Sequence, residues 1–414
     1  MTDQDFDLVI FGATSFVGKI LCQYLTEHFG VDGKLKWAAA GRSQNKLDTL
    51  RESLGDVAMD LKLLIADAGD EDALRRMCDQ ARVVISTVGP YALYGEPLVR
   101  VCAKTGTDYC DLAAEVQWIR RMIGNYERQA AESGARIVHC CGFDSIPSDL
   151  GVFFLQQHAL ERFGAPCVDI KMRVKSMRGG VSGGTVASMM NLFKEVAANP
   201  ALRKELANPY SLCPAGHSFT AHQHTIKFAE HDADFKAWAA PFVMAAVNTR
   251  IVHRSNALSD NAYGDAFRYE EAMLTGRGLA GRTMAFGVVA GLTGFLLAAA
   301  FRPSRWALEK FVVPAPGEGP SPGSRARGCF DLRFVGETAA GRKLFAKVTG
   351  DADPGYGAAS KMLGQAGICM ALDFAKPDKP GGFWTPATMF GERLLERLQA
   401  HAGMTFELVD RPLG

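Results

Sequence analysis

The chain has 414 residues, so we expect more than one domain, because single hydrophobic cores rarely grow beyond about 250–300 residues. Hydrophobic residues make up 48% of the chain and charged residues 22%, which is typical of a folded globular protein and excludes a disordered one. The 46 basic and 45 acidic residues leave a formal net charge of +1, which gives no reason to expect a nucleic-acid partner. The acidic start does not resemble a secretory signal, which favours a cytoplasmic location.

The first 150 residues alternate short apolar runs with amphipathic stretches. The runs predict strands at Phe6–Phe11, Lys36–Ala40, Leu61–Ile65, Val83–Thr87, Tyr109–Leu112 and Arg136–Cys140. The stretches between them predict helices at Val17–His28, Asn45–Leu54, Asp70–Asp79, Glu96–Thr105 and Val116–Glu132. Strands that alternate with helices of this length indicate a doubly wound parallel sheet, so residues 1–150 are predicted to form a Rossmann domain.

The rhythm changes after this region and predicts a second, α+β domain over residues 151–354. Ser148 is a candidate cap for a helix that runs to about Phe163, and a strand is expected at Asp169–Lys175. Cys329–Glu337 and Lys343–Thr349 alternate apolar and polar residues as an antiparallel hairpin does. Residues 355–414 are expected to form C-terminal helices that pack back on the Rossmann domain.

A glycine-containing loop joins the first predicted strand to the first helix. The loop reads Gly12-Ala13-Thr14-Ser15-Phe16-Val17-Gly18. Gly12 allows a tight turn, Gly18 allows the helix to pack closely on the strand, and the helix N-terminus offers amide groups to a diphosphate. Serine replaces the middle glycine of the usual fingerprint, and Ser15 can donate its hydroxyl to phosphate. The alternative is a plain turn that binds no ligand.

The end of the second strand indicates which dinucleotide binds. An NAD enzyme usually has an acidic residue there, whereas this chain has Gly41-Arg42-Ser43, with Lys46 one helical turn later. Arg42 can hold a 2′-phosphate bidentately, so the pattern favours NADP(H) over NAD(H). The alternative for Arg42 is a solvated loop cation.

Two further loops belong to the predicted cofactor site. Asp67, after the third strand, either holds the adenine amino group or begins the turn before Asp70. Val88-Gly89-Pro90 ends the fourth strand, where the crevice of a doubly wound sheet lies and where the nicotinamide half should pass.

Taken together, these motifs resemble the saccharopine dehydrogenase-like oxidoreductase family, in the branch that contains bacterial trans-acting enoyl reductases. The matching segments are Gly12–Gly18, Ala39–Ser43, Ser86–Tyr91, Tyr109–Leu112, Cys141–Asp149, Ser182–Thr185, Asp353–Gly357 and Gly382–Pro386. The resemblance implies an NADP(H)-dependent oxidoreductase with a role in lipid or glycolipid metabolism. One position departs from the family pattern, because Ala114 stands where glycine usually precedes the acid, here Glu115.

An uncharged segment of 18 residues, Met284–Phe301, has arginines on both sides. As a helix it would extend roughly 27 Å, against a hydrocarbon core of about 30 Å. Three interpretations stay open: a buried core helix, an apolar element that contacts a membrane surface or lines a lipid pocket, and a true membrane span. Members of the resembling branch are associated with membranes or lipid droplets, which favours lipid contact.

Reduction of a C=C bond conjugated to a carbonyl needs a hydrogen-bond donor for the carbonyl and an acid for the α carbon. Loops at the strand ends offer candidate catalytic residues, which are Tyr91, Asp111, Asp144 and Ser145. Structural alternatives stay open: the aromatic Tyr91 can be a packing residue, and Asp144 and Ser145 can shape the turn before Pro147. The four histidines between His217 and His231 lack zinc-ligand spacing, so no metal site is expected.

The sequence therefore predicts an NADP(H)-dependent reductase that acts on a lipidic acyl or enoyl substrate. The partners expected are this substrate, a membrane surface contacted peripherally through 284–301, and a second copy in a homodimer. Two other hypotheses stay open. One is a non-catalytic NADP-binding protein attached to membranes or lipid droplets. The other is an amino-acid dehydrogenase like saccharopine dehydrogenase itself.

Overall fold

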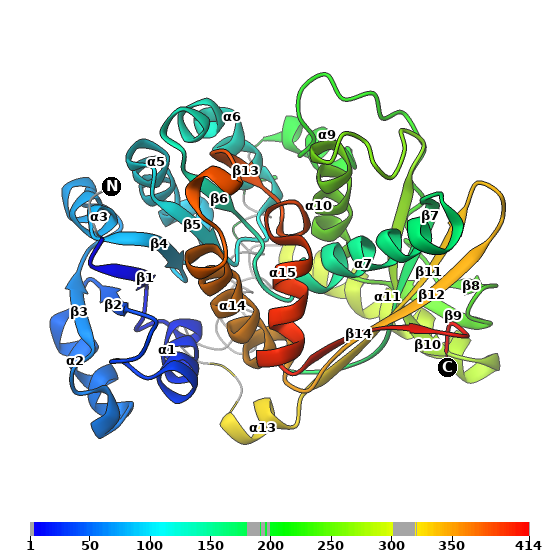
Figure 1. Ribbon diagram of the computed structural model, residues 1–414. Helices are drawn as coiled ribbons and strands as arrows, with labels where there is room; N and C mark the ends of the chain where they lie inside the picture. The colour runs from blue at the N-terminus through cyan, green and yellow to red at the C-terminus, as the bar shows by residue number, and fades with distance from the viewer. Residues whose placement is uncertain are drawn as a thin grey trace. The chain divides into compact units, whose positions relative to one another are not determined.

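The computed structural model describes residues 4–179, 191, 195–196, 199–300, 319 and 321–413. The chain divides into two compact units (Figure 1). Unit 1 contains residues 1–143, 316–319 and 355–402, and unit 2 contains residues 144–315, 320–354 and 403–414. The predicted C-terminal segment 355–414 thus contributes to both units, with its first part in unit 1 and its last residues in unit 2.

Unit 1 is built on a parallel sheet in the order β13-β6-β5-β4-β1-β2-β3. Its strands are β1 (Phe6–Phe11), β2 (Trp37–Gly41), β3 (Lys62–Ile65), β4 (Ala81–Ser86), β5 (Asp108–Asp111), β6 (Arg136–Val138) and β13 (Gly382–Trp384). The order reverses between β1 and β4, which is the switch point of a Rossmann fold. The predicted doubly wound parallel sheet is confirmed, with β13 as an additional edge strand from the C-terminal part.

Helices from both ends of the chain cover this sheet. They are α1 (Phe16–Phe29), α2 (Gln44–Ser53), α3 (Glu71–Asp79), α4 (Tyr91–Tyr94), α5 (Glu96–Thr105), α6 (Val116–Ser133), α14 (Ala359–Leu372) and α15 (Pro386–His401), with the short turns η1 (Asp56–Ala58), η2 (Pro354–Ala358) and η3 (Lys376–Asp378). Helix α14 packs on β1, β4 and β5 and contacts α1 and α15, whereas α3, α5 and α6 pack side by side. Gly367 lets α14 approach the sheet, because a Cβ there would lie 2.5 Å from Ile85 Cδ1.

Unit 2 is built on a mixed sheet in the order β14-β12-β11-β7-β10-β9-β8. Its strands are β7 (Cys167–Arg178), β8 (Glu230–Asp232), β9 (Ala237–Pro241), β10 (Arg268–Gly276), β11 (Cys329–Thr338), β12 (Lys343–Gly350) and β14 (Met404–Val409). The pair β7 and β10 is parallel, and all the other neighbours are antiparallel. The expected hairpin is β11–β12, and β11 pairs with the expected strand β7, for example Phe334 with Met172.

Over its described residues, unit 2 has the helices α7 (Ile146–Phe163), α9 (Pro200–Ala207), α10 (Ala245–Leu258), α11 (Gly278–Ala300) and α13 (Pro322–Ala326). Helix α7 packs on β7, β11 and β12, and α10 packs on α7 and β10. The N-cap of α7 is Ser145 rather than the expected Ser148. Pro147 occupies the first turn, where its missing N–H needs no partner, so the helix begins three residues earlier than predicted.

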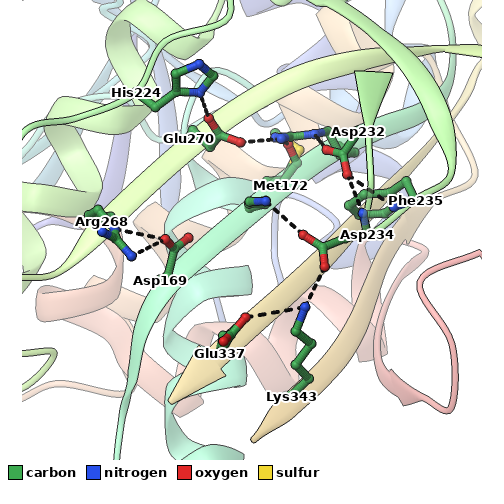
Figure 2. Close-up of polar contacts among 12 residues, drawn as sticks. Asp169, Met172, His224, Asp232, Asp234, Phe235, Arg268, Glu270, Glu337 and Lys343 are labelled. Carbon is green, nitrogen blue, oxygen red and sulfur yellow. Dashed lines mark hydrogen bonds and ion pairs between the residues drawn. The ribbon is translucent and has the colours of Figure 1, made fainter. Parts of the chain in front are cut away.

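The face of β7 opposite the buried Ile170, Met172 and Val174 is charged. Figure 2 shows ion pairs that cross this face between strands far apart in the sequence. Arg173 is fully buried and bonds Asp232 at 2.7 Å and also Glu270. Lys171 and Lys343 both bond Asp234, at 2.8 and 2.6 Å.

Two features noted in the sequence lie partly or wholly outside the described residues. The Ser182–Thr185 motif lies wholly outside them, and the uncharged segment Met284–Phe301 is described up to Ala300.

Candidate functional site

The loop between β1 and α1 is shaped so that only glycine fits at its two ends. Gly12 has a φ of +85°, and a Cβ there would lie 2.7 Å from Val88 Cγ2. A Cβ on Gly18 would lie 2.3 Å from the carbonyl oxygen of Gly12. Both contacts are closer than atoms tolerate, so the two glycines let the chain turn tightly and let α1 start against the loop, as a diphosphate cradle requires.

Side-chain hydroxyls hold the same loop together. Ser15 is the N-cap of α1 and accepts a hydrogen bond from the amide of Gly18 at 2.9 Å. Its Oγ also lies 2.9 Å from Thr87 Oγ1, which lies 2.9 Å from the carbonyl oxygen of Gly12. Ser15 thus fixes the loop from within, in addition to the phosphate-donating role predicted for it. Thr87 stands inside the Ser86–Tyr91 motif, but no local sequence signal predicts this contact.

A cationic pair stands at the end of β2. Arg42 and Lys46 are exposed, and among the described residues neither forms an ion pair. Ser43 is the N-cap of α2, and its side chain makes no capping hydrogen bond. Thr14 of the phosphate loop lies close by, with its Oγ1 3.8 Å from where a Cβ on Gly41 would be. The predicted groups for a 2′-phosphate therefore adjoin the predicted diphosphate loop, with their charges uncompensated by any described acid.

Asp67 lies beyond β3 and is exposed. Its carboxylate accepts the amide of Gly69 at 2.8 Å, and its carbonyl accepts the amide of Asp70. These bonds form the turn that leads to α3, which was one of the two roles proposed for Asp67. The adenine contact stays a prediction.

The loop after β4 carries Val88, Gly89 and Pro90 directly beside the phosphate loop, since the amide of Thr87 bonds the carbonyl of Phe11 at 2.9 Å. The carboxylate of the buried Glu115 accepts the amides of Tyr91 and Ala92, each at 2.9 Å. Glu115 therefore anchors the start of α4 and fixes the course of this loop. In the sequence, Glu115 stands out only because Ala114 replaces the glycine that usually precedes this acid.

Tyr91 is buried, and its hydroxyl is engaged with the backbone. The hydroxyl donates to the carbonyl of Ser86 at 3.0 Å and accepts the amide of Leu112 at 3.2 Å. These bonds tie the ends of β4 and β5 together at the carboxyl edge of the sheet. Tyr91 thus holds two strand ends together, and its role as a proton donor stays a prediction.

Asp111 lies at the same edge and is fully buried. One oxygen accepts Tyr109 Oη at 2.8 Å and lies 2.7 Å from His139 Nδ1, and the other accepts the amide of Ala113 at 2.9 Å. Burial and the nearby carboxylate raise the pKa of Tyr109 well above its ordinary value, so this phenol stays protonated. The structure thus brings Tyr91 and Asp111 together through the loop after β5, whereas Asp144 and Ser145 belong to unit 2.

An aromatic contact from the C-terminal part reaches the phosphate loop. Tyr356 packs edge-on against Phe16, with ring centroids 5.1 Å apart. Tyr356 lies in the Asp353–Gly357 motif, so a segment more than 300 residues away in the sequence supports the first turn of α1. Periodicity along the chain carries no signal for such a contact.

Comparison with known proteins agrees with this site. Residues 8–138 match the family model described as the saccharopine dehydrogenase NADP binding domain. A Mycobacterium tuberculosis protein that provisionally carries the name trans-acting enoyl reductase is 42% identical, over 98% of each chain. The trans-acting enoyl reductase of Mycobacterium ulcerans is 37% identical, over 95% of this chain and 96% of the relative.

Among solved structures, the apo saccharopine dehydrogenase (L-Glu forming) of Saccharomyces cerevisiae matches with a TM-score of 0.54 and 13% identity. The match covers 97% of this chain and 99% of the yeast chain, and it supports the fold alone. The chain therefore belongs to the trans-acting enoyl reductase branch of the saccharopine dehydrogenase-like family, and it is an NADP(H)-dependent oxidoreductase.

Proposed function

We propose that this protein uses NADPH to reduce a C=C bond conjugated to the carbonyl of an acyl or lipid substrate in lipid or glycolipid metabolism. The observation that carries the cofactor half is the cradle of Gly12 and Gly18, which lies next to Arg42 and Lys46, two cations without an ion pair in the described part of the chain. The names of relatives at 37–42% identity support the reaction type.

We assign cofactor binding to one set of residues, and substrate orientation and protonation to another. The first turn of α1 binds the diphosphate through its amides, and Arg42 with Lys46 binds the 2′-phosphate. When bound, the cofactor supplies a hydride for the β carbon of the substrate. The protein must orient the carbonyl and deliver a proton to the α carbon. Tyr91, Asp111, Asp144 and Ser145 are the candidates for this second task.

Helix α11 supports the lipid half of the proposal. Within the described residues it is long and apolar enough to cross a membrane by length and composition, and 11% of its apolar stretch is buried. A core helix would be mostly buried, so the exposure of the described part supports lipid contact over the core interpretation. Gly281 and Ala285 face the protein, where the helix packs on β9 and β10, whereas Met284, Phe286 and Leu297 are exposed.

The basic end of α11 fits an anionic lipid surface. Arg282 lies over the ring of Trp238, 5.4 Å from its centroid, and residues 277–300 contain no acid. A tryptophan and an arginine at the base of an apolar helix are typical of the level of the lipid headgroups. We therefore propose a cytoplasmic enzyme that docks on membranes through the exposed side of α11.

The cofactor assignment is tested by Arg42→Ala. We expect NADPH affinity to fall by about 10- to 100-fold, because a charge-assisted contact with the 2′-phosphate is lost, and NADH affinity to stay unchanged. Arg51→Ala is the matched control, since Arg51 lies on the neighbouring helix α2 and is paired with Asp48 at 3.1 Å. Equal losses for both cofactors would contradict the 2′-phosphate role. NADPH oxidation with a panel of enoyl thioesters and lipid enones then tests the reaction.

Membrane docking is tested by Phe286→Glu with Leu297→Glu. Both side chains are half exposed or more, so the double variant should fold. We expect it to lose most of its flotation with vesicles that contain anionic lipid, because charged groups enter apolar lipid at high cost. Val57→Glu is the control, because Val57 is an exposed apolar residue of unit 1. Unchanged flotation of the double variant would contradict the docking role of α11.

A further inference from the structure

A buried polar cluster in unit 2 joins three elements beneath the start of α7. It consists of Ser145 and Ser148 of α7, Asn248 of α10, and Tyr269 and Glu271 of β10, all of them nearly inaccessible to solvent. Glu271 is the ionisable carboxyl at its centre. No arginine or lysine bonds it among the described residues, so its charge has only neutral hydrogen-bond partners.

The hydrogen bonds of the cluster form a directed chain. Tyr269 Oη donates to Glu271 Oε1 at 2.7 Å, and Asn248 Nδ2 donates to Glu271 Oε2 at 2.9 Å. The same Nδ2 donates to Ser148 Oγ at 3.1 Å. At its other end, Asn248 Oδ1 accepts the hydroxyl of Ser145 at 3.0 Å. This arrangement matches an ionised Glu271, because both carboxylate oxygens accept and neither must donate.

A proton on Oε2 of Glu271 needs the opposite arrangement. On Oε1 the carboxylic O–H faces the hydroxyl oxygen of Tyr269, whereas on Oε2 it faces the Asn248 amide, which must then present its oxygen. If that amide turns over, Oδ1 accepts from Glu271 and from Ser148, and Nδ2 donates to Ser145 Oγ. The Ser145 hydroxyl is then released from Asn248 and can donate elsewhere. The proton comes from solvent, no covalent bond to carbon, nitrogen or sulfur changes, and no proton crosses the amide.

The surroundings place this exchange near neutral pH. Burial, opposed by hydrogen bonds from Tyr269, Ser148 and Asn248, raises the pKa of Glu271 to about 7. The other charged or titratable groups around it are Tyr269 on its own strand, Asp149 on α7 and Arg173 on β7. Asp149 bonds Ser255 of α10 at 2.6 Å. On the same helix, Arg250 bonds the carbonyl of Leu206 and Arg254 bonds the carbonyl of Leu212.

We propose that Glu271 is a proton-controlled positioning residue, whose protonation reverses the hydrogen bonds that pass through Asn248 and so frees the hydroxyl of Ser145 at the N-cap of α7. Ser145 and the adjacent Asp144 are among the predicted catalytic residues. The effect on turnover rests on the proposed function, whereas the effect on unit 2 does not.

Stability measurements test the switch without any substrate. The folded pKa of Glu271 lies above the ordinary value of 4.5, so the native state holds an extra proton between about pH 4.5 and 7. The stabilisation is full below that window, and it is lost as pH rises through it, by up to about tenfold in the folding equilibrium per pH unit. Glu271→Gln cannot ionise, so the difference between wild type and this variant should show that loss.

Glu407→Gln is the matched control, because Glu407 is a half-exposed carboxyl of the same sheet, on β14, and is paired with Lys347 at 2.8 Å. This control should lose the same amount of stability as the wild type when the pH rises from about 4.5 to 7. If Glu271→Gln retains that loss as well, the titrating group is not Glu271 and the proposal fails. Should Glu271→Gln not fold, infrared spectra of the wild-type protein decide. A protonated-carboxyl band must appear between pH 8 and 6, and its absence overturns the proposal.

The activity arm uses the pH profile of kcat/KM with NADPH and an enoyl thioester. We expect the wild-type rate to fall above about pH 7, and Glu271→Gln to keep its rate there. If kcat/KM of Glu271→Gln falls above about pH 7 as it does in the wild type, Glu271 does not act on the reaction. If no enoyl substrate is turned over by either protein, the proposed function fails, while the stability and infrared measurements still decide the switch.

Discussion

The sheets of the two units are surrounded differently. In unit 1, β2 is buried along its whole length, and β1 is buried over its last four residues, with apolar side chains on both faces. In unit 2, β7 turns apolar residues to one face and charged residues to the other, where ion pairs join four strands and a loop. Both units contain buried charge pairs, since Arg136 bonds Asp108 in unit 1. Unit 1 depends more on the close approach of its backbone segments, whereas in unit 2 the pairs form a network across one face of the sheet.

This difference predicts which substitutions each unit tolerates. In unit 1, the sensitive positions are glycines at which an added methyl group would displace the backbone. In unit 2, they are the central members of the ion-pair network, because an unmatched buried charge costs more than a lost contact at the surface.

The largest effect is expected for Arg173→Met, which leaves Asp232 and Glu270 without their buried partner. We expect a loss of about 3–5 kcal/mol in unfolding free energy, measured by urea denaturation. Lys343→Met is the control at the partly exposed edge of the same network and should cost about 0–1 kcal/mol. Similar losses for the two variants would mean that burial does not govern this network.

A smaller loss, in cofactor binding, is expected for Gly18→Ala. The added Cβ would meet backbone atoms of Gly12 and Ala13, so α1 must shift and its first-turn amides move away from the diphosphate. We expect NADPH affinity to fall at least tenfold, about 1.4 kcal/mol, in fluorescence titrations. Gly124→Ala is the control, since nothing lies within 4 Å of its Cβ position. Wild-type affinity in Gly18→Ala would rule out the close-approach argument.

Tyr91→Phe separates structure from chemistry at the carboxyl edge of unit 1. Removal of the hydroxyl breaks its bonds to Ser86 and Leu112, so we expect a loss of about 1–2 kcal/mol in stability. If Tyr91 also donates the proton, kcat should fall by about 100-fold or more while NADPH affinity stays unchanged. If the variant loses stability but keeps the wild-type kcat, Tyr91 has a structural role and does not donate the proton.

The smallest effect concerns acid sensitivity in unit 2. Burial alone would raise the pKa of Asp234, but hydrogen bonds from Lys171 and Lys343 outweigh it and hold that pKa below its ordinary value of 3.8. Its stabilisation is therefore present above about pH 4 and is lost as the pH falls further. Because Asp234 is partly exposed, the contribution should be about 1 kcal/mol or less. We expect the melting temperature of Asp234→Asn to fall less steeply than that of the wild type as the pH drops below about 4. The same fall in both proteins would contradict the pairing of Asp234 with the two lysines.

The sequence predicts unit 1 well because its signals are local. The strands, the turn at Gly12 and the basic end of β2 each follow from a few neighbouring residues. The contacts that fix the candidate site are not local: Glu115 anchors the amide of Tyr91 across 24 positions, and Tyr356 packs on Phe16 across 340 positions. The burial of Glu271 likewise follows from how α7 and α10 pack on β10. Periodicity gives no information about such pairs.

Unit 1 is completed only by the C-terminal part of the chain. Strand β13 extends the sheet beside β6, and α14 buries β1, β4 and β5. During synthesis the first 143 residues leave the ribosome long before these two elements exist. The apolar strands β1, β4 and β5 therefore stay exposed to solvent until α14 is made. Folding of the cofactor domain can therefore be completed only after α14 and β13 have been synthesised, and a truncated N-terminal fragment should aggregate rather than bind dinucleotide.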